Sequence, residues 1–151
     1  MSNDELKTFI LGENPDAVIT EGKQFLTVLV TADKLHEMAK MLKESAETSF
    51  DYLFCLTGVD YPEYFEIVYH LKSIKLNHEM ALKTRTVGRE DGRIDSVWDI
   101  WRTAEFHERE VYDLLGVKFN NHPDLRRLFL EDGWGFPLRK DYVDEVRIIE
   151  R

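Results

Sequence analysis

The sequence predicts an α+β fold: a two-layer α/β sandwich with a mixed sheet, followed by a C-terminal helix and an extended tail. Apolar residues follow the 3.6-residue period of a helix near the N-terminus, over 32–46 and over 96–115. Between these stretches they alternate with the two-residue period of strands, which gives the order α-β-β-α-β-β-β. After Gly116, glycine, proline and charged residues interrupt every regular pattern, so we expect residues 118–151 to be extended.

The length and composition are those of a single globular domain. The chain has 151 residues, of which 43% are hydrophobic and 12% aromatic, enough to form a buried core. Its net charge of −9 argues against a nucleic-acid-binding protein, because such proteins need a basic surface. No stretch approaches the roughly 18 consecutive apolar residues of a membrane span, and the N-terminus lacks a signal-peptide pattern. We therefore expect a cytoplasmic chain that reaches a membrane only through partners.

The N-terminal elements are marked by capping and turn residues. Ser2 and Glu5 form a capping-box pattern, and Gly12 is expected to end this first, short helix. Residues 17–20 and 24–30 are predicted strands, because their apolar and β-branched residues surround the turn Glu21-Gly22.

The middle of the chain holds a second helix and three further strands. The helix is predicted over 32–46, where one apolar stripe faces a side of lysines and glutamates. Strands are predicted over 50–56, 64–71 and 75–86, with a turn at Lys72-Ser73 that makes the last two an antiparallel pair.

Residues 96–115 return to helical spacing, and Gly116 stands where a helix stop belongs. Glu108 falls on the apolar stripe of this helix, and a carboxylate facing the core needs a partner. Arg126 or Arg127 is expected to supply a bidentate one. The opposite face carries a ladder of alternating charges at spacings of four: Glu105, Arg109 and Asp113.

The chain is thus expected to divide into a core domain over 1–117, which includes this helix, and a tail over 118–151 that is ordered mainly by contact with a partner. The arginines of the tail are expected to pair with carboxylates in this domain or on a partner protein. Beside them stand aromatic residues typical of an interface. The candidate partner-contact residues are His122, Pro123, Asp124, Leu125, Arg126, Arg127, Trp134, Phe136, Arg139, Lys140 and Asp141. The candidate structural residues are Glu108, Arg109, Asp113 and Gly116.

No familiar catalytic or cofactor-binding motif occurs in the sequence. Cys55 is the single cysteine, whereas an iron–sulfur cluster normally needs four cysteine ligands. The histidines do not show the spacing of a zinc protease, and no glycine-rich phosphate loop or nucleophile elbow is present. We therefore expect no catalytic, cofactor-binding or metal-binding residue in this chain.

Three charged blocks carry a resemblance to a known family. Glu-Arg-Glu at 108–110 leads to Asp-Leu-Leu-Gly at 113–116, then His-Pro-Asp-Leu-Arg-Arg at 122–127 and Pro-Leu-Arg-Lys-Asp at 137–141. In this order the blocks resemble the signature of one subunit of NADH:quinone oxidoreductase, the subunit named C, which forms the 30-kDa subunit family of respiratory complex I.

The resemblance implies a non-catalytic structural subunit of the hydrophilic arm of a proton-pumping NADH:quinone oxidoreductase. It implies packing on the quinone-proximal subunit, named D, near the cluster-carrying subunit, named B, at the cytoplasmic side of the inner or plasma membrane. It also implies that FMN, iron–sulfur clusters and quinone are bound by partner subunits and that this chain binds none of them.

Two alternatives stay open. The chain has Phe136 where the family usually has His, and Val143 where it usually has Pro. These departures leave room for an equivalent scaffold subunit in a related membrane-bound hydrogenase or other cofactor dehydrogenase. A free-standing small α/β enzyme using Glu108, Arg109 and His122 is the alternative from a different class, and it would turn over a substrate when purified alone.

Overall fold

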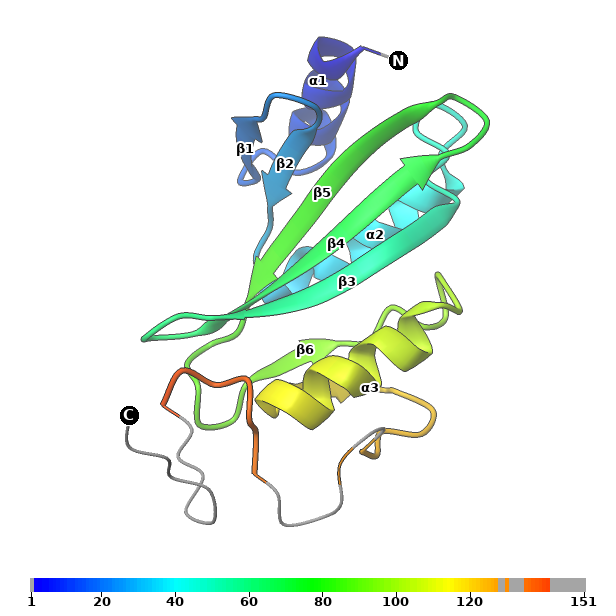
Figure 1. Cartoon of the computed structure of the whole chain (residues 1–151). Helices are drawn as coiled ribbons and strands as arrows, with labels where there is room; N and C mark the ends of the chain where they lie inside the picture. The colour runs from blue at the N-terminus through cyan, green and yellow to red at the C-terminus, as the bar shows by residue number, and fades with distance from the viewer. Residues whose placement is uncertain (1, 128–129, 131–134, 142–151) are drawn as a thin grey trace.

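A computed structural model describes residues 2–127, 130 and 135–141 of the chain (Figure 1). Its elements follow in the order α1 (Asn3–Glu13), β1 (Val18–Glu21), β2 (Leu26–Leu29), η1 (Ala32–Lys34), α2 (Leu35–Glu44), β3 (Tyr52–Asp60), β4 (Phe65–Ser73), β5 (His78–Arg85), β6 (Arg93–Asp95), α3 (Ala104–Leu115) and β7 (Lys118–Asn120). The predicted order α-β-β-α-β-β-β is confirmed up to β5, and β6 and β7 are additional. Within the described residues, no helix is both long and apolar enough to cross a membrane.

The helix ends depend on local hydrogen bonds. The capping box of α1 is present: the Glu5 amide donates to Ser2 Oγ at 3.2 Å, and the Ser2 amide donates to the Glu5 carboxylate at 3.0 Å. The helix continues past the stop expected at Gly12 to Glu13, and Asn14 caps it in an extended conformation. The second predicted helix begins with the 3₁₀ turn η1 and continues as α2.

The main sheet has the strand order β1-β2-β5-β4-β3. Its mixed character is confirmed, because β2 and β5 run parallel while the other neighbours run antiparallel. The turn expected at Lys72-Ser73 is too early, since β4 extends through Ser73. The Ser73 hydroxyl instead accepts from the Leu76 amide at 3.1 Å, and Asn77 takes a positive φ of 52° in the turn that follows.

One face of this sheet forms the core, and α1 and α2 pack on it (Figure 1). Alternate β4 residues are fully buried in this core: Phe65, Ile67, Tyr69 and Leu71. The opposite face carries a partly exposed aromatic group in which the His70 ring contacts the rings of Phe25 and Phe54, each at a centroid distance of 5.7 Å. The sheet is therefore covered by helices on one face, which gives the predicted two-layer architecture.

The helix predicted over 96–115 begins only at Ala104. Ahead of it the chain forms hydrogen-bonded turns, in which the Ile100 and Trp101 amides both donate to the Val97 carbonyl. These turns keep buried residues at spacings of three and four, so the segment has the sequence pattern of a helix. Gly116 does end α3, with a left-handed φ of 81°.

A small parallel sheet of β6 and β7 extends the core beyond the boundary expected at residue 117. Ile94 pairs with Phe119, and both side chains are buried. Strands of three residues are too short to show a two-residue period, which is why the sequence does not predict them.

Helix α3 lies along β3 and covers its free edge. An added Cβ at Gly58 would stand 2.6 Å from the Leu115 side chain and 3.0 Å from that of Val111, so only glycine permits this close approach. The Leu56 amide donates to His107 Nδ1 at 3.3 Å, and Thr103 Oγ1 donates to the Leu53 carbonyl at 3.0 Å. The helix thereby satisfies edge groups that could otherwise pair with another strand.

Candidate partner interface

Asp113 anchors the tail to α3. Its carboxylate is fully buried, and Arg127 Nε donates to it at 2.7 Å while the Leu130 amide donates to its second oxygen at 3.1 Å. Arg127 Nη2 also donates to the Asp113 backbone carbonyl at 2.8 Å. The tail arginine and the helix carboxylate thus form a charge-assisted pair within one chain.

Arg109 binds the same stretch of tail from one helical turn away. Its Nε donates to the Arg126 carbonyl and its Nη2 to the Arg127 carbonyl, each at 3.2 Å. Two members of the charge ladder on this face of the helix, Arg109 and Asp113, therefore do not face solvent. Arg109 and Asp113 are buried because the tail lies over them and shares their hydrogen bonds.

Three arginines and two phenylalanines alternate in a stack between the tail and the core. The Arg139 guanidinium lies between Phe136, at 4.6 Å from its ring centroid, and Phe65, at 5.1 Å. Arg127 stands over Phe136 at 5.3 Å and Arg89 over Phe65 at 5.1 Å. Burial, and then the charge of Arg89, lower the pKa of Arg139 from its ordinary value.

Backbone contacts attach the segment 135–141 to α3. Arg139 Nε donates to the Leu115 carbonyl at 2.6 Å, and the Leu138 amide donates to the Leu114 carbonyl at 3.1 Å. Gly116 leaves room for this approach, because a Cβ there would stand 2.7 Å from Arg139 Nη2.

The segment 135–141 also binds the end of β3 and the loop after β5. The Lys140 amide donates to the buried Asp60 carboxylate at 2.8 Å, and Arg89 Nη2 lies 2.9 Å from its other oxygen. Arg89 also pairs with Asp141 at 3.5 Å. Sequence reasoning missed Asp60, Phe65 and Arg89, because nothing local distinguishes them from ordinary strand and loop residues.

His122 fixes a turn at the start of the tail. Its Nε2 lies 3.0 Å from the Glu105 carbonyl, and its Nδ1 lies 3.0 Å from the Asp124 amide. Since a backbone amide can only donate, Nδ1 accepts and Nε2 carries the proton. Arg126 Nε pairs with Asp124 at 2.9 Å, while Pro123 is exposed and Leu125 packs against the core.

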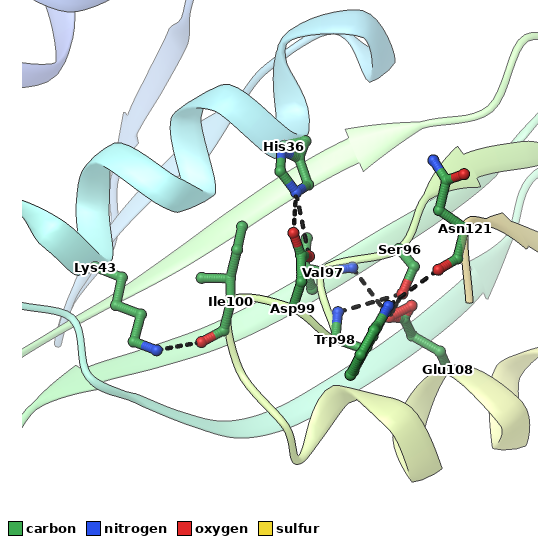
Figure 2. Close-up of polar contacts among 9 residues, drawn as sticks. All are labelled: His36, Lys43, Ser96, Val97, Trp98, Asp99, Ile100, Glu108 and Asn121. Carbon is green, nitrogen blue, oxygen red and sulfur yellow. Dashed lines mark hydrogen bonds and ion pairs between the residues drawn. The ribbon is translucent and has the colours of Figure 1, made fainter. Parts of the chain in front are cut away.

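Glu108 is fully buried, but its partner is not an arginine. One oxygen, Oε1, accepts from Ser96 Oγ at 2.7 Å and from the Val97 amide at 3.1 Å (Figure 2). Burial raises the pKa of Glu108 from 4.5 to about 8, although the hydrogen bonds from Ser96 and Val97 act in the opposite direction. The expected pairing with Arg126 or Arg127 is wrong, because those residues lie over Arg109 and Asp113 on another face of the helix.

Side chains from several elements hold the segment between β6 and α3 (Figure 2). From α2, His36 Nε2 lies 2.9 Å from the Asp99 carboxylate, and Lys43 Nζ donates to the Ile100 carbonyl. Trp98 Nε1 donates to the Asn121 carbonyl at 3.0 Å. These contacts fix the segment that precedes α3 to α2 and to the chain that follows β7.

Two candidate contact residues, Arg126 and Lys140, stay exposed after these bonds are made. Leu138, which is not among the candidates, is 60% exposed beside them. Trp134 lies outside the described residues. Among the residues that the structure describes, no three His, Cys, Asp or Glu side chains gather in a way that could hold a metal ion.

The chain is similar to known respiratory proteins over most of its length. Residues 28–146 match the family described as the 30-kDa subunit of respiratory-chain NADH dehydrogenase. The NADH-quinone oxidoreductase subunit named C in Chlorobium phaeobacteroides is 45% identical over 126 residues, covering 81% of this chain and 75% of that protein. The subunit of the same name in Geobacter sulfurreducens is 43% identical over 142 residues, covering 87% of this chain and 85% of that protein.

Two further similarities extend to larger proteins and assemblies. The NADH-quinone oxidoreductase subunit named C/D in Phocaeicola vulgatus is 50% identical over 119 residues, which are 78% of this chain but only 22% of that longer protein. A chain in the structure of the membrane-bound sulfane sulfur reductase, an archaeal respiratory membrane complex, superposes with a TM-score of 0.80 at 31% identity. That match covers 95% of this chain and 86% of the other.

Proposed function

The chain belongs to the 30-kDa subunit family of respiratory-chain NADH dehydrogenases, and we propose that it is a non-catalytic structural subunit of a proton-pumping NADH:quinone oxidoreductase. In this role it lies in the hydrophilic arm, at the cytoplasmic side of the membrane, and packs on the quinone-proximal subunit near the cluster-carrying one. FMN, the iron–sulfur clusters and quinone are bound by partner subunits, and this chain carries no electron.

The burial of the signature charges is the observation that carries this proposal. Glu108, Arg109 and Asp113 are buried, and they form hydrogen bonds with the chain's own backbone and side chains. A catalytic group must reach its substrate, which these three side chains cannot do in this arrangement. Both ring nitrogens of His122 bond to backbone groups. This arrangement supports a structural role and counts against a free-standing enzyme built on these residues.

An apolar surface at one end of the molecule supports a partner-binding role. Tyr61, Val87 and Leu138 are 36%, 92% and 60% exposed, and we call these three residues the apolar end. They lie on the turn after β3, the loop after β5 and the tail, which meet at the end of the molecule below the sheet (Figure 1). The contacts of Asp60, Arg89 and Asp141 hold the three segments together. Each of the three segments thus presents an exposed apolar side chain at this end, which is where we propose that a partner docks.

The quinone-proximal subunit, named D, is the partner that the comparisons favour. The relatives from Phocaeicola vulgatus and Bacteroides thetaiotaomicron are named C/D, so in those proteins one polypeptide bears both subunit names. Two parts of one polypeptide are tethered and stay close to each other. This supports direct packing of the present chain on a separate quinone-proximal subunit.

A second candidate keeps the scaffold role but changes the complex. The structural similarity to a chain of the sulfane sulfur reductase, a different respiratory membrane complex, supports an equivalent subunit in a related complex, of which a membrane-bound hydrogenase or other dehydrogenase is an example. The two candidates differ in the electron donor and in the partner subunits, and they share the same fold and the same role for the tail.

Deletion and capture in the source organism test the proposal. We expect loss of the chain to abolish NADH:quinone reductase activity in membranes, and the full-length chain to restore it. A tagged chain should recover the quinone-proximal and cluster-carrying subunits from solubilised membranes, while the purified chain alone should show no turnover. Recovery of hydrogenase or sulfur reductase subunits would favour the second candidate, and NADH oxidation by the isolated chain would contradict both.

A further inference from the structure

Glu108 stands in an unusual place for a carboxyl group. Its Oε1 accepts two hydrogen bonds, but its Oε2 is buried with no hydrogen-bond partner. The Tyr69 hydroxyl is also buried without a hydrogen-bond partner, and the charge of Glu108 acts on it. An ionised carboxylate with one bare oxygen in such surroundings is costly, whereas a protonated one is neutral.

The charged groups that face Glu108 increase this cost. Asp99, from the segment before α3, is the charge that acts on Glu108, and it is negative; its own ion-pair partner is His36 of α2. From β6, Asp95 acts on the neighbouring Tyr69 and is also negative. The nearest arginine along α3, Arg109, donates to the carbonyls of the tail. No cation within the described residues forms an ion pair with Glu108.

We propose that Glu108 is held as a neutral carboxylic acid in the folded chain, and that loss of its proton acts as a switch that loosens the turn at residues 96–98. This turn depends directly on the carboxyl group, because Ser96 Oγ donates to Glu108 and in turn accepts from the Trp98 amide at 3.2 Å. When hydroxide removes the proton, the new charge draws water toward Oε2. The turn at residues 96–98, which follows β6 on the way to α3, then opens.

The direction of the pH effect follows from burial. Because burial raises the pKa of Glu108 from 4.5 to about 8, the folded chain keeps a proton that the unfolded chain loses above its ordinary pKa. The stability contribution is therefore complete below the unfolded pKa and is lost as the pH rises to the folded pKa. Between these limits the unfolding constant rises about tenfold per pH unit for one proton. Above the folded value this group adds no further pH dependence.

Glu108→Gln is the variant that tests the switch, because glutamine keeps an oxygen acceptor for Ser96 and Val97 and cannot ionise. Urea unfolding of the full-length chain is measured between about pH 6 and pH 9.5, a range that spans the raised pKa. We expect the wild-type unfolding constant to rise about tenfold per pH unit relative to the variant up to about pH 8, and then to level off. Parallel curves for the two proteins would overturn the proposal.

Glu110→Gln is the matched control, since Glu110 is exposed on the same helix and should leave the wild-type pH dependence unchanged. The tryptophan emission of the chain, to which Trp98 in this turn contributes, should change over the same pH range in the wild type and in Glu110→Gln, and stay constant in Glu108→Gln. If Glu108→Gln does not fold, infrared spectroscopy of the wild type decides. A protonated carboxyl band at pH 7 that disappears toward pH 9.5 supports the switch, and its absence at pH 7 overturns it.

Discussion

Asp113 is the residue on which attachment of the tail depends most. It is fully buried, and Arg127, whose side chain is only 11% exposed, has its carboxylate as ion-pair partner. Asp113→Asn removes the negative charge and leaves Arg127 unpaired, which we expect to cost about 3–5 kcal/mol of unfolding free energy. Glu110→Ala, at an exposed position of the same helix, should change it by less than about 0.5 kcal/mol. Equal urea midpoints for the two variants would show that the pair contributes nothing.

Arg139 and its neighbour Lys140 allow a test of the aromatic stack. The Arg139 guanidinium lies between two phenylalanine rings, whereas Lys140 contributes a backbone hydrogen bond and its side chain is exposed. Arg139→Lys keeps the charge but loses the planar group that can face both rings, so we expect a loss of about 1–2 kcal/mol. Lys140→Ala should be close to neutral. Thermal melts compare the two, and a neutral Arg139→Lys would contradict the role given to the stack.

Single residues also show how far the sequence can predict the site. The place of Glu108 on the apolar stripe predicts that its side chain is buried, and the structure confirms this burial. Its partner Ser96 could not be predicted, because the turn at 96–98 has no regular period. Asp60 and Arg89 were missed for a similar reason: they are far from the signature in sequence and join it only in three dimensions.

Among the elements, the packing of α3 against β3 depends on one glycine. Gly58→Ala would place a Cβ against the Leu115 and Val111 side chains, so the helix must shift, at an expected cost of about 1–3 kcal/mol. Gly12, in α1, has open space around its Cβ position, and Gly12→Ala should stabilise the chain by up to about 1 kcal/mol through helix propensity. Chemical denaturation measures both. A neutral Gly58→Ala would mean that α3 does not approach β3 this closely.

The elements with long periodic patterns were predicted well, and the three-residue strands β6 and β7 were not. The alternation over β4 and β5 predicts their antiparallel pairing, which is confirmed by the register from Glu66 and Arg85 to Ser73 and His78. The strands β6 and β7 are too short to show a period, and turns over 97–103 keep helical spacing without a helix. Local pattern therefore fails where tertiary contacts decide the conformation.

For the molecule as a whole, the main revision concerns what orders the tail. The sequence alone predicts that a partner orders it, but the described tail residues bond to α3 and β3 of the same chain. We therefore expect the Leu138 and Lys140 amides, which donate to the Leu114 carbonyl and to Asp60, to exchange slowly in the free chain. If both amides exchanged as fast as those of an unstructured peptide, the tail would depend on a partner for its order, as the sequence alone predicts.

The buried side chains of Arg109 and Asp113 hold the tail against α3. The proposed role of the apolar end is to bind the quinone-proximal subunit, and capture from native membranes tests this role. The test variant, tagged Leu138→Glu, places a charge in the apolar end. The control variant, tagged Ile74→Glu, places a charge in the turn between β4 and β5, at the opposite end of the sheet, where Ile74 is 65% exposed (Figure 1). A charge buried without a partner in an interface costs several kcal/mol, so we expect Leu138→Glu to recover at least about tenfold less of the quinone-proximal subunit than the wild type. Ile74→Glu should recover the wild-type amount. Equal recovery with Leu138→Glu, in a chain that melts like the wild type, would show that the apolar end does not bind this partner.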